Sequence, residues 1–195
     1  PYIFQEHGRT LMILSSCYID GRCLLPLYET TDLEMLRWDY LGLVFDTKLP
    51  GERPYFECPM LCKDGDRWVM TTCGGGESMQ YYAGSFDLDR LQFEVTSEDV
   101  MQYGSAPGHR RPDGGHDRGF VGSSMTYDQQ GRCLLLGWQS GFKIQRGWNG
   151  CMGLPRVLTI GADGSPRQQP VPELEVLRHE HFRLEALALD SRTEV

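Results

Sequence analysis

Apolar residues along this chain gather in short runs separated by polar turns, a pattern that predicts β-strands. In three segments an apolar run leads through a turn rich in Gly or Asp to a second apolar run, as in a β-hairpin. Arg9, Arg67 and Arg132 occupy the same point of the three segments, directly before the second run. The predicted strands are residues 2–4, 10–14, 23–28 and 38–45, then 60–62, 68–71, 80–86 and 91–95, then 124–127 and 133–136.

Repetition of an antiparallel, four-stranded unit predicts an all-β fold made of propeller blades, although the hairpins of a β-sandwich would give the same pattern. One helical pattern occurs, at residues 30–36, and it is short enough to be interpreted as a turn between strands. Propellers close with about four to eight blades. Three modules would leave sheet edges without a partner, so we expect about three blades of a larger propeller.

The composition is that of an ordinary globular protein. The chain has 195 residues, of which 40% are hydrophobic and 24% are charged, enough to bury a core in about one domain. Its net charge of −8 argues against a surface that binds nucleic-acid phosphates. The charge is compatible with a neutral ligand such as a sugar. No apolar run reaches the length of a transmembrane helix, about 18 residues, and nothing in the pattern indicates a compartment.

The cysteines and histidines form no known metal or redox motif. Seven cysteines occur without a Cys-x-x-Cys spacing, and most are expected to be small buried hydrophobes. Cys58 and Cys62 are expected on the same side of a strand. His179 and His181 would share a face of a predicted strand but have no third ligand at a suitable spacing, so no metal or other cofactor is expected. Two further features are interpreted as a turn and as a solvated acidic strip, namely Gly74–Gly76, and Glu173 with Glu175 and Glu180.

Glu57 is the carboxylate with the most unusual surroundings in the sequence. Aromatic residues precede it, Cys58 and Pro59 follow it, and an apolar run begins at Met60. Pro59 favours an extended backbone at Cys58. Dry neighbours would favour the protonated form of Glu57, as a general acid working near neutral pH requires. The alternative is a strand-end carboxylate that points into water.

Several runs together resemble glycoside hydrolase family 32, the β-fructosidases that include invertase, levanase and inulinase. Phe56–Pro59 is similar to the Glu-Cys-Pro motif of the family, and Leu135–Trp138 is similar to its Gly-Trp strand. Arg146–Thr159 resembles the stretch around Leu-Pro-Arg, and Gln169–Leu174 resembles the link to a second module. The resemblance implies part of a five-bladed β-propeller at residues 1–172. Residues 173–195 would then be the linker and start of a C-terminal β-sandwich.

The resemblance also implies the roles of individual residues. Glu57 matches the general acid/base. Trp138 is a candidate for stacking on the fructosyl ring, with a tryptophan that closes the last blade as the alternative. Cys58 is expected beside Glu57, where it would tune the site and contact substrate, or would be structural. Asp117, in a Gly-rich loop at residues 107–122, is a further candidate contact to substrate.

This chain departs from the family pattern at two places that matter. Pro1–Phe4 resembles the residues directly after the Asp of the Arg-Asp-Pro motif, and the Asp nucleophile of the family is not matched either. Glu57 is thus the one matched residue of three catalytic carboxylates, and we expect the missing N-terminal blades to supply the others. Val121–Ser123 stands where the family commonly has Phe-Tyr-Ala, so one sugar-facing ring is expected to be absent.

These observations predict a retaining glycosidase that cleaves β-fructofuranosidic bonds in sucrose, inulin or levan. The chain by itself is expected to be inactive, because the nucleophile is not matched. Two alternatives remain open. One is a sugar-binding propeller that has lost its chemistry. The other is a different five-bladed furanosidase, such as an arabinan-degrading enzyme.

Overall fold

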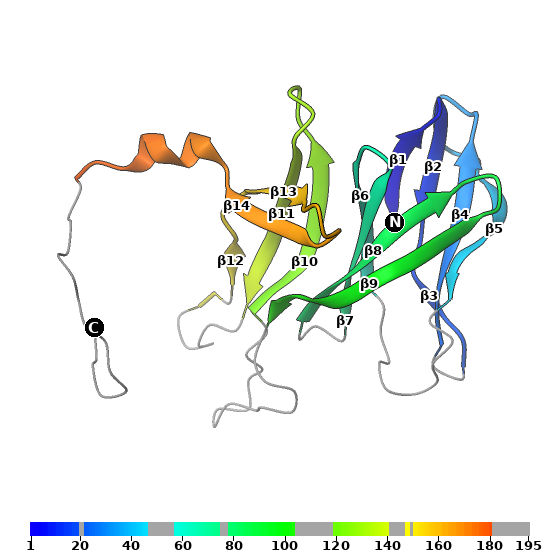
Figure 1. Ribbon diagram of the computed structural model, residues 1–195, viewed down its shortest axis with the longest axis horizontal. Coiled ribbons are helices and arrows are strands. Elements are labelled where there is room, and N and C mark those ends of the chain that lie inside the picture. Colours follow the sequence, from blue (N-terminus) through cyan, green and yellow to red (C-terminus); the bar gives the residue numbers. More distant parts are fainter. Residues whose placement is uncertain are drawn as a thin grey trace.

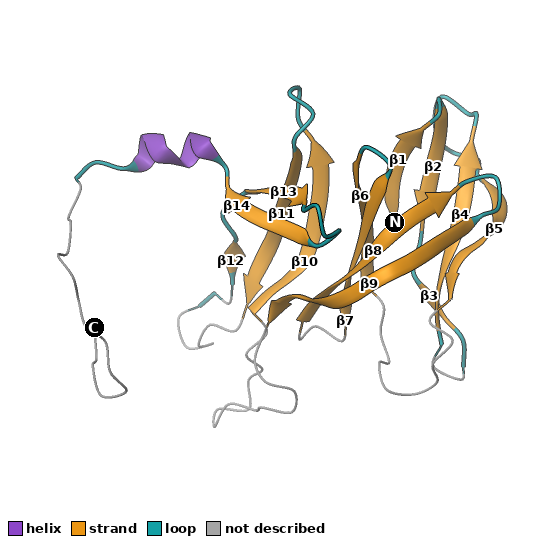
Figure 2. Cartoon of the chain, viewed as in Figure 1, coloured by secondary structure: helices purple, strands orange, loops and turns teal. Residues whose placement is uncertain are grey.

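The described residues fold almost entirely into antiparallel β-sheets. A computed structural model of the chain describes residues 1–19, 22–46, 57–74, 78–103, 119–140, 147–148 and 150–180. Within these residues three sheets follow one another along the chain, and a short 3₁₀ helix follows the last of them (Figures 1 and 2). The predicted all-β class is confirmed.

Each sheet is built mainly from strands that are neighbours in sequence. The first sheet contains β1 (Tyr2–Glu6), β2 (Arg9–Ile13), β4 (Cys23–Thr30) and β5 (Asp39–Asp46), with the short β3 (Ser16–Cys17) paired to the start of β4. The second contains β6 (Glu57–Asp64), β7 (Arg67–Gly74), β8 (Ser78–Asp87) and β9 (Gln92–Tyr103). The third contains β10 (Gly119–Tyr127), β11 (Cys133–Ser140), β13 (Arg156–Ile160) and β14 (Pro166–Pro170), with β12 (Cys151–Met152) paired to the end of β11.

The three predicted modules correspond to the three sheets. Every strand predicted from the apolar runs is present, and most extend further than the runs themselves. The segment interpreted as a turn contains no helix between residues 31 and 38. There the Asp32 carboxylate accepts hydrogen bonds from the N–H groups of Glu34 and Leu36. Closure into five blades and a following β-sandwich stay predictions.

Strand β6 is buried on both faces between the other two sheets. Leu61 belongs to the core shared with the first sheet, whereas Met60 and Cys62 belong to the core shared with the third. Side chains alternate between the two faces of a strand, so a strand with two buried faces needs a continuous apolar run. Each such side chain contributes about 1.5–3 kcal/mol when it is fully buried.

Polar contacts also join the first strands of neighbouring sheets to β6. The Tyr2 hydroxyl donates to the Leu61 carbonyl at 3.0 Å, and the Tyr127 hydroxyl accepts from the Lys63 N–H at 2.6 Å. Burial raises the pKa of the Tyr2 phenol above its usual range, which keeps it protonated as a donor. The Lys63 ammonium also pairs with the Glu6 carboxylate of β1. β6 is therefore held from both sides.

The three arginines that mark the repeat are structural. Arg9 at the start of β2 donates two hydrogen bonds to the Glu29 carboxylate, at 2.7 and 2.9 Å. Arg67 at the start of β7 donates to the carbonyl of Gly161, in the turn directly after β13 of the third sheet, at 2.5 Å. The repeated position therefore places an arginine side chain at the same end of each sheet. The guanidinium group of each arginine donates hydrogen bonds to a different partner.

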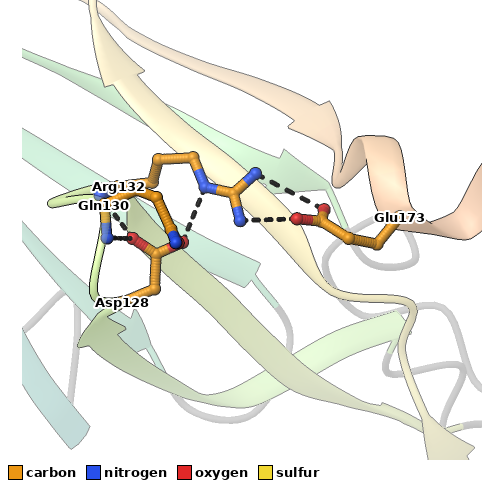
Figure 3. Close-up of polar contacts among 4 residues, drawn as sticks. All are labelled: Asp128, Gln130, Arg132 and Glu173. Carbon is orange, nitrogen blue, oxygen red and sulfur yellow. Dashed lines mark hydrogen bonds and ion pairs between the residues drawn. The ribbon is translucent and has the colours of Figure 1, made fainter.

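Arg132 links the last sheet to the helix that follows it. This helix, η2 (Pro172–Leu177), comes directly after Val171, whose side chain is buried and whose N–H donates to the Pro155 carbonyl. The Arg132 guanidinium donates to Asp128 at 2.6 Å and to Glu173 at 2.7 and 3.4 Å (Figure 3). Glu173 is exposed to solvent, as the interpretation of a solvated acidic strip requires, but it also has a specific partner, because the turn before β11 brings the Arg132 cation within reach.

The residues after η2 differ from the expectation of a strand. His179 lies outside regular secondary structure, and His181 lies outside the described residues. The proposed boundary at residue 172 falls at the first residue of η2. Whether residues 173–195 begin a β-sandwich stays a prediction.

We expect Tyr2→Phe to lower the free energy of unfolding by about 1–2 kcal/mol, because the substitution removes the donor to the buried Leu61 carbonyl. The measurement is equilibrium unfolding in urea. Tyr40→Phe is the matched control, since Tyr40 lies on β5 with 57% of its surface exposed. Equal stability of the Tyr2 and Tyr40 variants would contradict the role given to this hydroxyl.

The contact between Arg132 and Glu173 predicts an acid-sensitive position of η2. The hydrogen bond from Arg132 holds the pKa of Glu173 below its usual range. The contact therefore contributes above the unfolded-state pKa of a glutamate, about 4.3, and is lost as the pH falls through the lower folded value. Glu173→Gln should loosen η2 already at neutral pH, seen as faster amide exchange at residues 172–177. Glu175→Gln, on the same helix, is the control and should leave that exchange unchanged.

Candidate active site

Glu57 is the first residue of β6 and lies opposite Cys73 at the end of β7. Its side chain is exposed. The expectation that dry neighbours surround Glu57 is therefore wrong for the chain as the structure describes it. Residues 47–56, which include the aromatic residues expected to cover it, lie outside the described residues.

Cys58 forms a β-bulge directly after Glu57. Its φ is +50°, and the register of β6 with β7 shifts between the Glu57 and Met60 pairs, so Cys58 and Pro59 oppose a single residue. The expected extended backbone at Cys58 is therefore wrong. The bulge also interrupts the alternation of side chains between Cys58, which is exposed, and Cys62, which is buried. That the two cysteines share a side stays a prediction.

Two residues beside the bulge were not identified from the sequence, Cys73 and Ser123. The Cys73 sulfur lies 3.9 Å from the Ser123 hydroxyl on β10, and both residues are buried. Partial desolvation, followed by the nearby Cys73 thiol and the Glu57 carboxylate, raises the pKa of Cys58, which keeps that thiol protonated. Cys58, Cys73 and Ser123 come from three different strands, so no local sequence motif could have indicated that they lie close together.

Trp138 lies on β11 opposite Val121 of β10 and Met152 of β12. Its side chain is 40% exposed, so one part of the indole packs on the sheet and another part is open to solvent. Gly150 lies directly against the ring: a Cβ atom at this residue would fall 1.9 Å from the Trp138 Nε1 atom. The glycine is therefore required for the indole to occupy this position.

Gly137, directly before Trp138, and Arg156, of the Leu-Pro-Arg run, both lie against the aromatic ring of Phe120. A Cβ atom at Gly137 would fall 2.4 Å from the Phe120 ring, and the Arg156 guanidinium lies 4.3 Å from the centroid of that ring. Arg156 also donates to Gln102 of β9 at 2.8 Å and to Gln168 of β14 at 2.9 Å. Arg156 thus ties the third sheet to the second.

The structure places Glu57 and Trp138 at corresponding ends of neighbouring sheets. Glu57 is paired with Cys73, Cys73 contacts Ser123 on β10, and β10 carries the Val121 that pairs with Trp138. β10 therefore separates the acid/base candidate from the indole. Asp117, the remaining candidate contact to substrate, lies outside the described residues.

The departure at residues 121–123 forms a second bulge. The register of β10 with β11 shifts between Val121 and Ser124, and Gly122 has a φ of +56°. A Cβ atom at Gly122 would meet nothing within 4 Å, so the position opens onto free space. The ring expected there in the family is replaced by an opening beside the strand that carries Ser123.

The described residues offer neither a metal centre nor a membrane-spanning helix. Among the described residues, no group of three or more His, Cys, Asp or Glu side chains could hold a metal ion. The same part of the chain contains no helix long and apolar enough to cross a membrane.

Comparison with known proteins identifies the family. A sequence model described as the glycosyl hydrolases family 32 N-terminal domain matches residues 1–170. The chain belongs to this family. The resemblance carried by the Glu57, Trp138 and Arg156 runs is thereby confirmed.

Curated relatives of this family 32 chain are considerably longer than it is. The sucrose-6-phosphate hydrolase of Staphylococcus xylosus is 25% identical over 194 residues, which covers 91% of this chain and 36% of the relative. The enzyme of the same name from Zymomonas mobilis is 28% identical over 191 residues, with the same two coverages. The chain therefore spans just over a third of the length of these relatives.

Solved structures show that the fold is shared. Fructan 1-exohydrolase IIa from Cichorium intybus matches with a TM-score of 0.69 and 21% identity, over 89% of this chain and 34% of that one. Sucrose-6-phosphate hydrolase from Lactobacillus gasseri matches with a TM-score of 0.71 and 18% identity, over 91% of this chain and 37% of that one. The three sheets are therefore arranged as they are in these family 32 enzymes.

We expect Gly150→Ala to displace the Trp138 ring and lower the free energy of unfolding by about 1–3 kcal/mol, because the new methyl group has no room. The measurement is the indole N–H resonance of Trp138 together with urea unfolding. Gly164→Ala is the matched control, since Gly164 also has a positive φ but nothing within 4 Å of its Cβ position. An unchanged Trp138 resonance in the Gly150 variant would contradict the contact.

Proposed function

We propose that this chain carries the acid/base carboxylate, Glu57, of a retaining glycoside hydrolase that cleaves β-fructofuranosides. The observation that supports the proposal most directly is the position of Glu57. It is an exposed carboxylate at the first residue of β6, inside the Glu-Cys-Pro run of a family 32 chain. By their names, the curated relatives hydrolyse sucrose-6-phosphate, and one structural neighbour is a fructan exohydrolase. A fructoside of the sucrose, inulin or levan type is the corresponding substrate class.

In the proposed mechanism Glu57 acts twice. Its protonated form donates a proton to the leaving glycosidic oxygen, and its ionised form then removes a proton from the attacking water. A retaining mechanism needs a second carboxylate about 5–5.5 Å away as nucleophile. We assign that carboxylate to a part of the protein outside these 195 residues, and we expect the isolated chain to hydrolyse nothing.

The exposure of Glu57 fits an arrangement completed by other groups. A general acid near neutral pH needs an environment that disfavours its charge, either apolar contacts or a second negative group. Both a bound sugar and a nearby nucleophile carboxylate would supply that environment. We therefore propose that Glu57 becomes a competent acid only when the substrate and the second carboxylate are in place.

Trp138 and two weaker candidates complete the proposed site. The exposed part of the Trp138 indole offers an apolar surface to a sugar ring, and Gly150 lies directly against the Nε1 atom of the indole. Cys58, in the bulge directly after Glu57, places a neutral thiol beside the carboxylate. Asp117 stays a candidate on the basis of the family resemblance alone.

One observation favours a second function. The exposed position of Glu57, at the edge of the described part of the second sheet, is also compatible with a sugar-binding module that has lost catalysis. The two functions differ in what the removal of Glu57 does, because binding through Trp138 would survive it and catalysis would not.

We expect Glu57→Ala, in the protein that contains this chain, to reduce fructose release by about 100-fold or more, in line with the usual contribution of general acid/base catalysis. Added azide should restore part of the turnover of sucrose, measured as glucose release, because azide attacks the fructosyl-enzyme in place of water without needing a base and gives a fructosyl azide. The measurement is fructose release from sucrose and inulin. Glu94→Ala, which removes an exposed glutamate on β9, is the control and should leave the rate unchanged. Near-normal turnover in the Glu57 variant would refute the assignment.

A further inference from the structure

Cys17 and Cys23 face each other across a short pair of strands in the first sheet. They are direct partners in the antiparallel register of β3 and β4, and their sulfur atoms lie 3.3 Å apart. The sulfur atoms of a disulfide lie about 2.05 Å apart. The two sulfurs therefore need to approach by only about 1 Å in order to bond.

The backbone at this pair has the geometry that a disulfide requires. The next pair along the hairpin is bonded through the Tyr18 N–H and the Arg22 carbonyl, at 2.9 Å. Hydrogen-bonded and non-hydrogen-bonded pairs alternate along antiparallel strands, so Cys17 and Cys23 occupy a non-hydrogen-bonded position. Cα atoms at such a position are about 4.5 Å apart. That separation is within the range of about 4.4–6.8 Å found for disulfides.

The two thiols differ in their access to solvent. Cys17 is exposed, whereas Cys23 is only 2% exposed. Burial, assisted by the contact with Cys17, raises the pKa of the Cys23 thiol to about 12. A reagent in solution therefore meets Cys17 first, and Cys23 reacts with the sulfur that lies beside it.

We propose that Cys17 and Cys23 form a reversible cross-strand disulfide by exchange with a small-molecule disulfide of the glutathione class. The Cys17 thiolate attacks one sulfur of the reagent, which joins Cys17 to one glutathione and releases the other as a thiolate. Cys23 then loses its proton, and its sulfur attacks the Cys17 sulfur and expels the second glutathione. Two protein thiols and one oxidised glutathione thus become one protein disulfide and two reduced glutathiones.

The proposed disulfide would restrain the end of the first sheet at which β5 finishes, where the chain leaves for the second sheet. The Arg22 guanidinium lies 4.4 Å from the centroid of the Tyr18 ring and 3.4 Å from the Asp46 carboxylate. Asp46 is the last residue of β5, and the chain continues from it to Glu57 at the start of β6. A bond between β3 and β4 therefore limits the motion of the hairpin against which the end of β5 is held. The inference does not depend on the role proposed for Glu57.

The test is equilibration of the protein in buffers with defined ratios of reduced to oxidised glutathione, followed by acid quenching, alkylation and peptide mass spectrometry. We expect a product lighter by about 2 Da, with residues 17 and 23 linked, that reverts in excess reduced glutathione. Cys17→Ser should abolish this product. Cys151→Ser, which removes another exposed thiol, is the matched control and should leave the midpoint of the redox titration unchanged.

Repeating the titration in concentrated urea separates the effect of the fold from mere closeness in sequence. If the hairpin positions the sulfurs, the folded protein should keep the disulfide at glutathione ratios about tenfold or more reducing than the unfolded chain does. Faster exchange of the β3 and β4 amides in the reduced form is a second expected result. Equal midpoints in the folded and unfolded chain would overturn the proposal. So would accumulation of a glutathione adduct on Cys17 with Cys23 still open to alkylation.

Discussion

Burial of β6 on both faces is the constraint on which the rest of this structure depends. Leu61 packs toward the first sheet, while Met60 and Cys62 pack toward the third. The hydroxyls of Tyr2 and Tyr127 add hydrogen bonds from the two flanking strands to the same short stretch of backbone. Because both neighbours pack on one strand, the three sheets are held at fixed positions relative to the residue at its start, Glu57.

The bulge at Cys58 separates that rigid strand from the carboxylate. A residue at positive φ costs about 1–2 kcal/mol when it is not glycine, so the conformation persists because the strand on either side is firmly held. Glu57 and Cys58 at the bulge are exposed to solvent, while the next four residues are buried. The second bulge, at Gly122, lies on the neighbouring strand. Bulges occur more often than average next to active sites, where they re-aim side chains.

The exposed Glu57 carboxylate fits a chain that covers only part of the length of its relatives. The acid role requires a surrounding that Glu57 does not have in the described residues, and the chain covers just over a third of its curated relatives. Trp138 differs from Glu57, because the position of its ring is already limited within this chain by the contact with Gly150. The disulfide proposed for Cys17 and Cys23, which are free thiols in the structure, would add a covalent restraint at the end of the first sheet that leads to Glu57.

The sequence by itself determined the strands, the repeat and the family, because apolar runs, Gly-rich turns and the Glu57 and Trp138 motifs are all local patterns. It did not determine which carboxylates and thiols are buried and which are exposed to solvent. The exposure of Glu57, the bulge at Cys58, and the contact between Cys73 and Ser123 depend on how other strands pair with and pack against each segment. Only the packing of β6 against β7 and β10 decided them, since burial and register shifts are properties of neighbouring strands and not of any one segment.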